Sequence, residues 1–227
     1  FQRLVNTAFM DLLYPTGDTE SGVFEEPTRS RLCVYVDDLL AHDRTFAEHL
    51  RNLEQVFERL ESTGLSAKPS KYSICKPEQP FLGFVVDAET RRPDPEKVEA
   101  MGNFPEPLNR TAVQRFLGMA GYYRDFVDNF AKHTVHLRAK MRDDQPHRWT
   151  ALTEQGREEF ELLKHELASE CVVLNHPDWD APFYVQTDAC ADGLGAVLAL
   201  KVTDSATGRT VERPIRYASR SRQTQES

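Results

Sequence analysis

The chain has 227 residues, of which 40% are hydrophobic and 28% charged, as is ordinary for a globular protein of one large or two modest domains. Its formal net charge of −8 argues against a large phosphate-binding surface. No apolar run approaches the roughly 20 residues of a membrane span, and four widely spaced cysteines without a CxxC pair predict reduced thiols in an intracellular setting.

The first predicted element is a helix whose apolar residues recur at i, i+3 and i+4 from the first residue until Pro15. A polar stretch then leads to a hairpin with Leu32–Val36 and Leu39–Ala41 as its arms. Its tip holds Asp37 and Asp38, two like charges inside an apolar run. Two interpretations stay open from these residues: a solvated turn, or a divalent-metal site, since hard cations bind neighbouring carboxylates on a rigid hairpin.

A long amphipathic helix is expected after the hairpin, with Asp43 as its cap and Gly64 as its stop. The apolar face of this helix consists of Phe46, Leu50, Leu53, Phe57 and Leu60. Residues Phe81–Val86 then read as a second buried strand or hairpin arm. Helix, hairpin, helix and strand in this order predict an α+β domain that ends near Ala88.

A connector rich in proline and charge, with one short helix, is expected next. A helical pair follows, with Thr111 as its cap, and a third helix is predicted at roughly Thr153–Ser169. The hydrophobic period then changes to two, so that residues 183–202 read as a hairpin and residues 212–220 as a third strand. This change predicts a second domain that starts near Val172.

Several segments carry a family resemblance in collinear order: "FQRLVN", "YVDD", the helix and lysine-bearing loop at 46–76, "FLGFVV", "VQRFLGMAGYYRDFV" and "FYVQTDACADGLGAVL". In that order they are similar to the nucleotide-pocket helix, catalytic hairpin, palm helix, primer grip, thumb-side helices and first ribonuclease H strands of gypsy-like LTR retrotransposon Pol polyproteins. The match covers nearly the whole chain. Because the chain starts and stops in mid-pattern, we expect a fragment of a longer polypeptide.

The resemblance implies an RNA-directed DNA polymerase that works through two Mg²⁺ ions, with Asp37 and Asp38 as catalytic metal ligands. Tyr35 and Val36 would lie beside the primer terminus and the incoming nucleotide. Asp188 resembles the first metal-binding carboxylate of ribonuclease H, which cleaves the RNA strand of a hybrid.

Further residues take binding roles by the same resemblance. The implied primer grip consists of Leu82, Gly83 and Phe84. Lys71 matches a catalytic lysine near the departing pyrophosphate, although a solvated surface lysine remains the alternative, while Lys68 and Lys76 would contact the nucleic-acid backbone. The implied partners are an RNA template, a DNA primer, an RNA–DNA hybrid, deoxynucleoside triphosphates and the remainder of the Pol polyprotein. No membrane is involved, and the expected location is a cytoplasmic virus-like particle or the nucleus.

The implied fold is α+β, with a partial reverse-transcriptase palm over 1–90, a helical thumb or connector region over 91–170 and the first strands of a ribonuclease H-like domain over 171–227. The third polymerase carboxylate and the later ribonuclease H carboxylates of the family have no counterpart in this chain, and Cys190 stands where a serine is usual. We therefore expect the chain alone to be inactive. The alternative is a degenerate or co-opted relic that binds nucleic acid or protein without catalysis.

Overall fold

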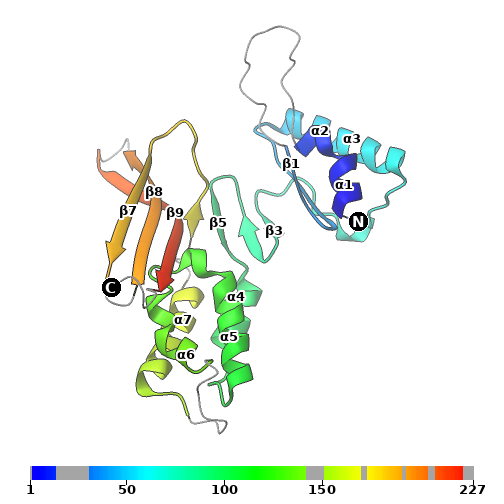
Figure 1. Cartoon of the computed structure of the whole chain (residues 1–227). Helices are drawn as coiled ribbons and strands as arrows, with labels where there is room; N and C mark the ends of the chain where they lie inside the picture. The colour runs from blue at the N-terminus through cyan, green and yellow to red at the C-terminus, as the bar shows by residue number, and fades with distance from the viewer. Residues whose placement is uncertain are drawn as a thin grey trace. The chain divides into compact units, whose positions relative to one another are not determined.

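The computed structural model describes residues 2–13, 31–141, 151–169, 173–190, 193–203 and 208–221. The chain divides into two compact units, Phe1–Lys76 and Pro77–Ser227, each with its own hydrophobic core (Figure 1). No helix within the described ranges is both long and apolar enough to cross a membrane.

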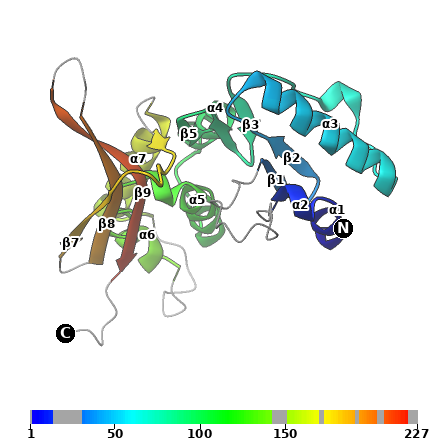
Figure 2. The ribbon, with the colours of Figure 1, turned by 90° about the horizontal axis from the view of Figure 1, so that it is seen from above.

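The first unit combines helices with a two-stranded antiparallel hairpin (Figure 2). In chain order its elements are α1 (Gln2–Ala8), α2 (Met10–Leu13), β1 (Leu32–Tyr35), β2 (Asp38–Ala41), α3 (Phe46–Thr63) and the 3₁₀ turn η2 (Pro69–Lys71). The largest buried apolar side chains are Phe9 and Leu32, and Val5 and Val56 pack with them. The predicted helix, hairpin and second helix are confirmed, and the first helix is split in two at Phe9.

A capping box starts α3. The Thr45 hydroxyl accepts from the Glu48 N–H at 3.2 Å, and the Glu48 carboxylate accepts from the Thr45 N–H at 3.1 Å. The helix ends as expected at Gly64, whose φ of 67° gives a left-handed C-cap. The expectation that Asp43 caps this helix is wrong, because its carboxylate binds other side chains of the unit.

The predicted apolar face of α3 is only partly covered by the described residues. Phe46 is 65% exposed and Leu50 is 49% exposed, whereas Asn52 and Val56 are buried. The helix therefore turns a polar amide toward the core at a position between its leucines. The side-chain amide of Asn52 binds both ends of the β1–β2 hairpin.

The second unit opens with a four-stranded antiparallel sheet of order β3-β4-β5-β6. Its strands are β3 (Gln79–Phe81), β4 (Phe84–Val86), β5 (Thr90–Pro93) and β6 (Leu174–Asn175). The segment Phe81–Val86 is thus a turn with parts of two strands, and β6 joins the sheet from far along the chain. All four strands of this sheet belong to the second compact unit. The predicted boundaries between the palm, the thumb or connector region and the ribonuclease H-like domain, near residues 90 and 170, stay a prediction.

Helices and 3₁₀ turns form the main core of the second unit. In its described part they are α4 (Pro95–Gly102), α5 (Arg110–Tyr122), η3 (Arg124–Phe126), η4 (Lys132–Thr134), α6 (Val135–Ala139) and α7 (Glu154–Ala168). The fully buried rings of Phe116 and Phe160 meet with centroids 4.5 Å apart. The predicted third helix is confirmed as α7, and Thr153 caps it by accepting from the N–H of Gly156. The cap of α5 is Asn109, so the expectation for Thr111 is wrong: Thr111 lies inside the first turn.

An antiparallel sheet of order β7-β8-β9 follows in the same unit. Its strands are β7 (Phe183–Ala189), β8 (Gly193–Thr203) and β9 (Thr210–Ser221), which confirms the predicted hairpin and third strand. Every residue of β7 is exposed, and within the described ranges this strand lies at the edge of the sheet. At the opposite edge of this sheet, Arg216 of β9 forms an ion pair with Asp125 of η3 at 3.0 Å.

Candidate active sites

Tyr35, Val36, Asp37 and Asp38 form the tip of the β1–β2 hairpin. Tyr35 pairs with Asp38, so the turn consists of Val36 and Asp37 alone. Val36 has a φ of 53°, in the left-handed region that β-branched residues rarely adopt. Such a backbone costs on the order of 1–3 kcal/mol and persists only where the surrounding structure imposes it, which is typical of functional sites.

This tip is accessible. Tyr35 is 57% exposed, Val36 is 41% exposed, and both aspartates are exposed. Carboxylate oxygens are the ligands that Mg²⁺ prefers, so the chemistry of this pair fits such an ion. Within the described residues, no group of three or more acidic, histidine or cysteine side chains lies close enough to hold a metal. Asp37 and Asp38 therefore offer two carboxylates to a centre that needs further ligands.

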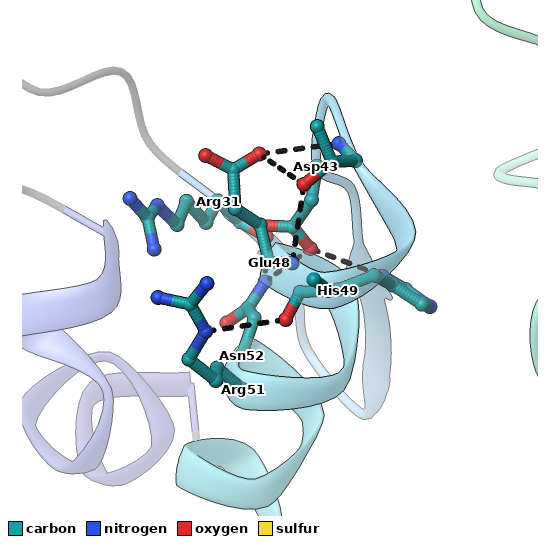
Figure 3. Close-up of polar contacts among 8 residues, drawn as sticks. Arg31, Asp43, Glu48, His49, Arg51 and Asn52 are labelled. Atoms are coloured by element: carbon teal, nitrogen blue, oxygen red, sulfur yellow. Dashed lines mark hydrogen bonds and ion pairs between the residues drawn. The ribbon is translucent and has the colours of Figure 1, made fainter.

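Buried polar groups fix the base of the same hairpin to α3 (Figure 3). The carbonyl oxygen of Arg31, before β1, accepts from the N–H of His42, after β2, at 3.0 Å and from the side-chain amide of Asn52 at 2.8 Å. The same amide donates to the Asp43 carboxylate at 3.0 Å, and this carboxylate lies 3.0 Å from Nδ1 of His49. Both ends of the hairpin are thereby tied to one helix.

Lys68, Lys71 and Lys76 lie on the loop after α3, and all three are exposed. Lys71 is the last residue of η2. The ring of Tyr72 holds this loop against α3, with its centroid 5.8 Å from that of Phe57. Exposure fits both a phosphate contact and an ordinary surface lysine, so the role of Lys71 stays a prediction.

The implied primer grip is a second two-residue turn, between β3 and β4. Leu82 and Gly83 have φ values of 50° and 74°, and two successive left-handed residues are typical of a type I′ hairpin turn. Their carbonyl oxygens accept from the hydroxyls of Tyr122 and Tyr123 at the end of α5. Phe84 begins β4 and packs among aromatic rings. The sequence pattern of this helix gives no sign of the contact between these tyrosines and the turn.

Asp188 is exposed near the end of β7 and pairs with Gly195 of β8. Residues directly opposite in an antiparallel pair project to the same face of the sheet. On that face, the side-chain oxygen of Asn129 occupies the space that a Cβ on Gly195 would need. Close by in the chain, the N–H of Ala131 donates to the Ser219 hydroxyl of β9 at 2.8 Å. The turn before η4 thus packs on the sheet beside Asp188, a proximity that the sequence does not indicate.

The candidate residues gather at separate places. The aspartate pair and the lysine loop belong to the first unit, whereas the Leu82–Gly83 turn and Asp188 belong to the second. The aspartate turn is exposed and the Leu82–Gly83 turn is half-buried, and each hairpin has a defined anchor within its own unit. The chemistry available is cation binding by carboxylates at the first hairpin, and main-chain contacts at the second.

Two family models match the chain. Residues 1–86 match the model described as "Reverse transcriptase (RNA-dependent DNA polymerase)". Residues 152–227 match the model described as "RNase H-like domain found in reverse transcriptase". The first match contains Asp37 and Asp38, and the second contains Asp188.

Curated proteins give the same assignment. The chain is 35% identical over 178 residues to the retrovirus-related Pol polyprotein from transposon gypsy of Drosophila melanogaster, covering 74% of this chain and 17% of that protein. It is 31% identical over 220 residues to the corresponding polyprotein from transposon 412 of the same organism, covering 97% and 16%. It is also 30% identical over 193 residues to the enzymatic polyprotein of Cauliflower mosaic virus (strain Strasbourg), covering 84% and 27%. The chain spans about a sixth of the two fly proteins.

Two solved structures of a foamy viral protease-reverse transcriptase share the fold. The dRH form in complex with double-stranded DNA has a TM-score of 0.74 at 23% identity, covering all of this chain and 35% of that chain. The form in complex with an RNA/DNA hybrid has a TM-score of 0.68 at 25% identity, covering 86% and 25%. The mixed helix-and-sheet architecture expected from the sequence is therefore confirmed.

Proposed function

This chain belongs to the reverse transcriptase and ribonuclease H family of gypsy-like retrotransposon Pol polyproteins, and we propose that it forms the part of such a polyprotein that carries the polymerase hairpin and the first ribonuclease H strands. The complete protein copies RNA into DNA and cleaves the RNA strand of the resulting hybrid. It acts inside the cell, in a cytoplasmic virus-like particle or the nucleus, together with the remainder of the polyprotein.

The polymerase role depends on Asp37 and Asp38, which would hold Mg²⁺. When bound there, such ions would supply charge neutralisation for the triphosphate and would favour ionisation of the primer 3′-hydroxyl. The chain's own task is to keep both carboxylates on an exposed and stiff turn. The observation that carries this proposal is the strained backbone of Val36 next to the acidic pair, because strain at an exposed tip is retained where a function requires that geometry. Tyr35 and Val36 then face the primer end and the incoming nucleotide.

The remaining candidates support binding of the substrates. Lys71 stabilises the departing pyrophosphate or donates a proton to it, and Lys68 and Lys76 bind backbone phosphates. The turn Leu82–Gly83 offers main-chain groups to the primer, since glycine allows close approach of another backbone. These contacts imply a template–primer duplex and deoxynucleoside triphosphates as ligands.

Asp188 is proposed as one carboxylate that would hold Mg²⁺ in the ribonuclease H site, where the ion would supply activation of water for hydrolysis of the RNA strand. Its exposed position near the end of β7 and the family match over residues 152–227 support this role. The other carboxylates of that site would come from outside this chain.

The test of the polymerase role is primer extension by the full-length polyprotein. We expect Asp37→Asn to reduce synthesis to background, because the turn then loses one of its two charged ligands. The matched control is Glu54→Gln, which removes an exposed acid on α3 and leaves the turn unchanged. Undiminished synthesis by Asp37→Asn would refute the proposal.

A second candidate function is a non-catalytic module that binds nucleic acid or protein. It is favoured by the lack, among the described residues, of a complete group of metal ligands, and the net charge of −8 favours a protein over a nucleic acid as the ligand. For residues 1–227 alone we expect neither polymerisation nor hybrid cleavage. Measurable turnover by the purified chain would contradict that expectation.

A further inference from the structure

The Leu82–Gly83 turn is held by two neighbouring tyrosines. Tyr122, the last residue of α5, donates its hydroxyl to the carbonyl oxygen of Leu82, and Tyr123 donates its hydroxyl to the carbonyl oxygen of Gly83 at 2.9 Å. Two successive hydroxyls thus bind two successive carbonyls, 40 residues earlier in the chain. These hydrogen bonds connect the end of one helix directly to the tip of one hairpin.

Aromatic rings extend this connection behind the turn. The ring of Phe84 stacks on Tyr122, with centroids 5.3 Å apart, and on Phe126, with centroids 5.6 Å apart. It meets Tyr123 edge-on at 5.5 Å. The guanidinium of Arg91, on the neighbouring strand β5, lies 5.5 Å from the Phe126 ring centroid. The tyrosines therefore belong to a packed aromatic cluster and are not free to follow the turn if it moves.

A side chain at Gly83 would be crowded by both tyrosines and strained by the φ of 74° at this position. A Cβ at this position would lie 3.3 Å from a ring carbon of Tyr122 and 3.3 Å from the hydroxyl oxygen of Tyr123. Its carbonyl oxygen also accepts from the N–H of Asp94 at 3.0 Å. The turn is thus fixed by steric contacts and by hydrogen bonds from Asp94, which directly follows β5, and from the two tyrosines at the end of α5.

We propose that Tyr122 and Tyr123 are positioning residues for DNA synthesis, which act by holding the Leu82–Gly83 turn in the conformation that grips the primer. This inference rests on the proposed function, since it takes the turn to be the primer grip. Each hydroxyl donates its one proton to the turn and has none left to donate to a primer phosphate. The tyrosines therefore set how often the primer 3′-hydroxyl is held at reactive distance. They affect the rate of nucleotide incorporation more than the affinity for the primer–template duplex.

The hold on the turn can be tested on residues 1–227 by amide hydrogen exchange. In the double variant Tyr122→Phe/Tyr123→Phe both rings remain and two hydrogen bonds are lost. We expect about tenfold faster exchange of the amides in residues 79–94, with unchanged exchange in β8. The control is Tyr184→Phe, an equal chemical change on the exposed strand β7. Equal exchange in the double variant and the wild type would overturn the proposal.

The effect on synthesis is measured in the full-length polyprotein as single-nucleotide incorporation on a pre-bound primer–template. We expect the double variant to incorporate about tenfold more slowly, with the Kd for primer–template changed less than about twofold. Gly83→Ala, which keeps both hydroxyls but crowds them, should slow incorporation as well. If the double variant does not stay folded under the assay conditions, the single variant Tyr122→Phe replaces it in both measurements. Tyr122 is 54% exposed, so the loss of its one hydroxyl should perturb the fold little.

The outcomes separate the two proposals. Should Asp37→Asn abolish synthesis while the tyrosine variants incorporate at the wild-type rate, the positioning role is wrong and the polymerase role stands. Should Asp37→Asn leave synthesis unchanged, the polymerase role itself is wrong. A loss of duplex affinity equal to the loss in rate would also overturn the positioning role, because it would place the tyrosines in binding.

Discussion

The side-chain amide of Asn52 donates at once to the carbonyl oxygen of Arg31, at 2.8 Å, and to the carboxylate of Asp43, at 3.0 Å (Figure 3). The two acceptors flank the β1–β2 hairpin at its beginning and its end. One buried side chain therefore closes the base of the hairpin whose tip carries Asp37 and Asp38. A stiff base is what allows a short turn to hold a strained residue and two like charges in a fixed geometry.

Asn52→Leu should loosen this hairpin. The substitution preserves size but leaves the buried Asp43 carboxylate and the Arg31 carbonyl each short of a donor, which costs about 1–3 kcal/mol. We expect the free energy of opening of residues 31–64, measured by native-state amide exchange in residues 1–227, to fall by that amount. The control is Gln55→Leu, on the exposed side of the same helix. Equal opening energies in Asn52→Leu and the wild type would mean that the amide contributes nothing net.

Val36→Gly should stabilise the hairpin and impair synthesis. Glycine adopts a φ of 53° without strain, and relief of on the order of 1–3 kcal/mol outweighs its added chain entropy of roughly 0.5–1 kcal/mol. We expect a net gain of about 1 kcal/mol in the opening free energy of the hairpin, again by amide exchange. Val34→Gly, inside strand β1, should instead destabilise it.

The same Val36→Gly change in the full-length polyprotein tests why the strain is kept. A freely moving tip aligns the two carboxylates less often, so primer extension should fall although the fold is more stable. A variant that is more stable and equally active would show that the strain has no role in synthesis.

Local features of this fold follow from the sequence. The helices, the β7–β8 hairpin and strand β9 were predictable because their hydrophobic period is set by residues near in the chain. Gly64 was a reliable stop because few other residues tolerate its φ of 67°. The predicted cap of α3 was wrong because Asp43 and Thr45 are both good capping residues and lie within one turn of each other. Only the capping box with Glu48 distinguishes Thr45 from Asp43.

Long-range features did not follow. The pairing of β5 with β6 joins strands that four α-helices separate in the described part of the chain, and no short window contains both. The tyrosine hydroxyls reach a turn 40 residues away, and an aromatic pair in a helix predicts only burial. The one usable signal was Asn52, a polar residue in the buried stripe of an amphipathic helix, because a buried amide needs partners.

Gly195→Ala should displace Asn129 from the sheet. The new methyl would overlap the side-chain oxygen of Asn129, which has to move away from the face that bears Asp188. We expect a loss of about 1–2 kcal/mol in the stability of the second unit, measured by amide exchange of β8. The loss should shrink in an Asn129→Gly background, because glycine leaves the space empty and suits the φ of 49° at that position. Equal losses in both backgrounds would mean that the two residues are not coupled.

Alkaline pH should weaken the hold on the Leu82–Gly83 turn. Burial, assisted by Tyr122 and Asp94, raises the pKa of Tyr123 from 10.0 to about 12. The neutral phenol is thus favoured by folding, so this stabilisation is complete below pH 10 and is lost as the pH rises toward 12. We expect the stability of the wild type to fall more steeply than that of Tyr123→Phe across this range, in paired denaturation curves. Lysines titrate in the same range, so the readout is the difference between the two proteins. Parallel curves would contradict the assignment.

Replacing the lysines of the loop after α3 should make hybrid binding less dependent on salt. Each ammonium that neutralises a phosphate contributes about −0.9 to the slope of log K against log salt concentration. If Lys68, Lys71 and Lys76 all contact the backbone, their combined change to Gln should reduce the slope by about 2–3, measured by fluorescence anisotropy on residues 1–227 with an RNA–DNA hybrid.

The control for this measurement is Lys97→Gln, an exposed lysine of α4 that has no proposed contact with nucleic acid. It should leave the slope unchanged. With a net charge of −8 the chain repels phosphates at long range, so binding by the wild type requires a local basic surface. An unchanged slope in the triple variant would mean that these three lysines do not contact the backbone of the hybrid and that the basic surface lies elsewhere.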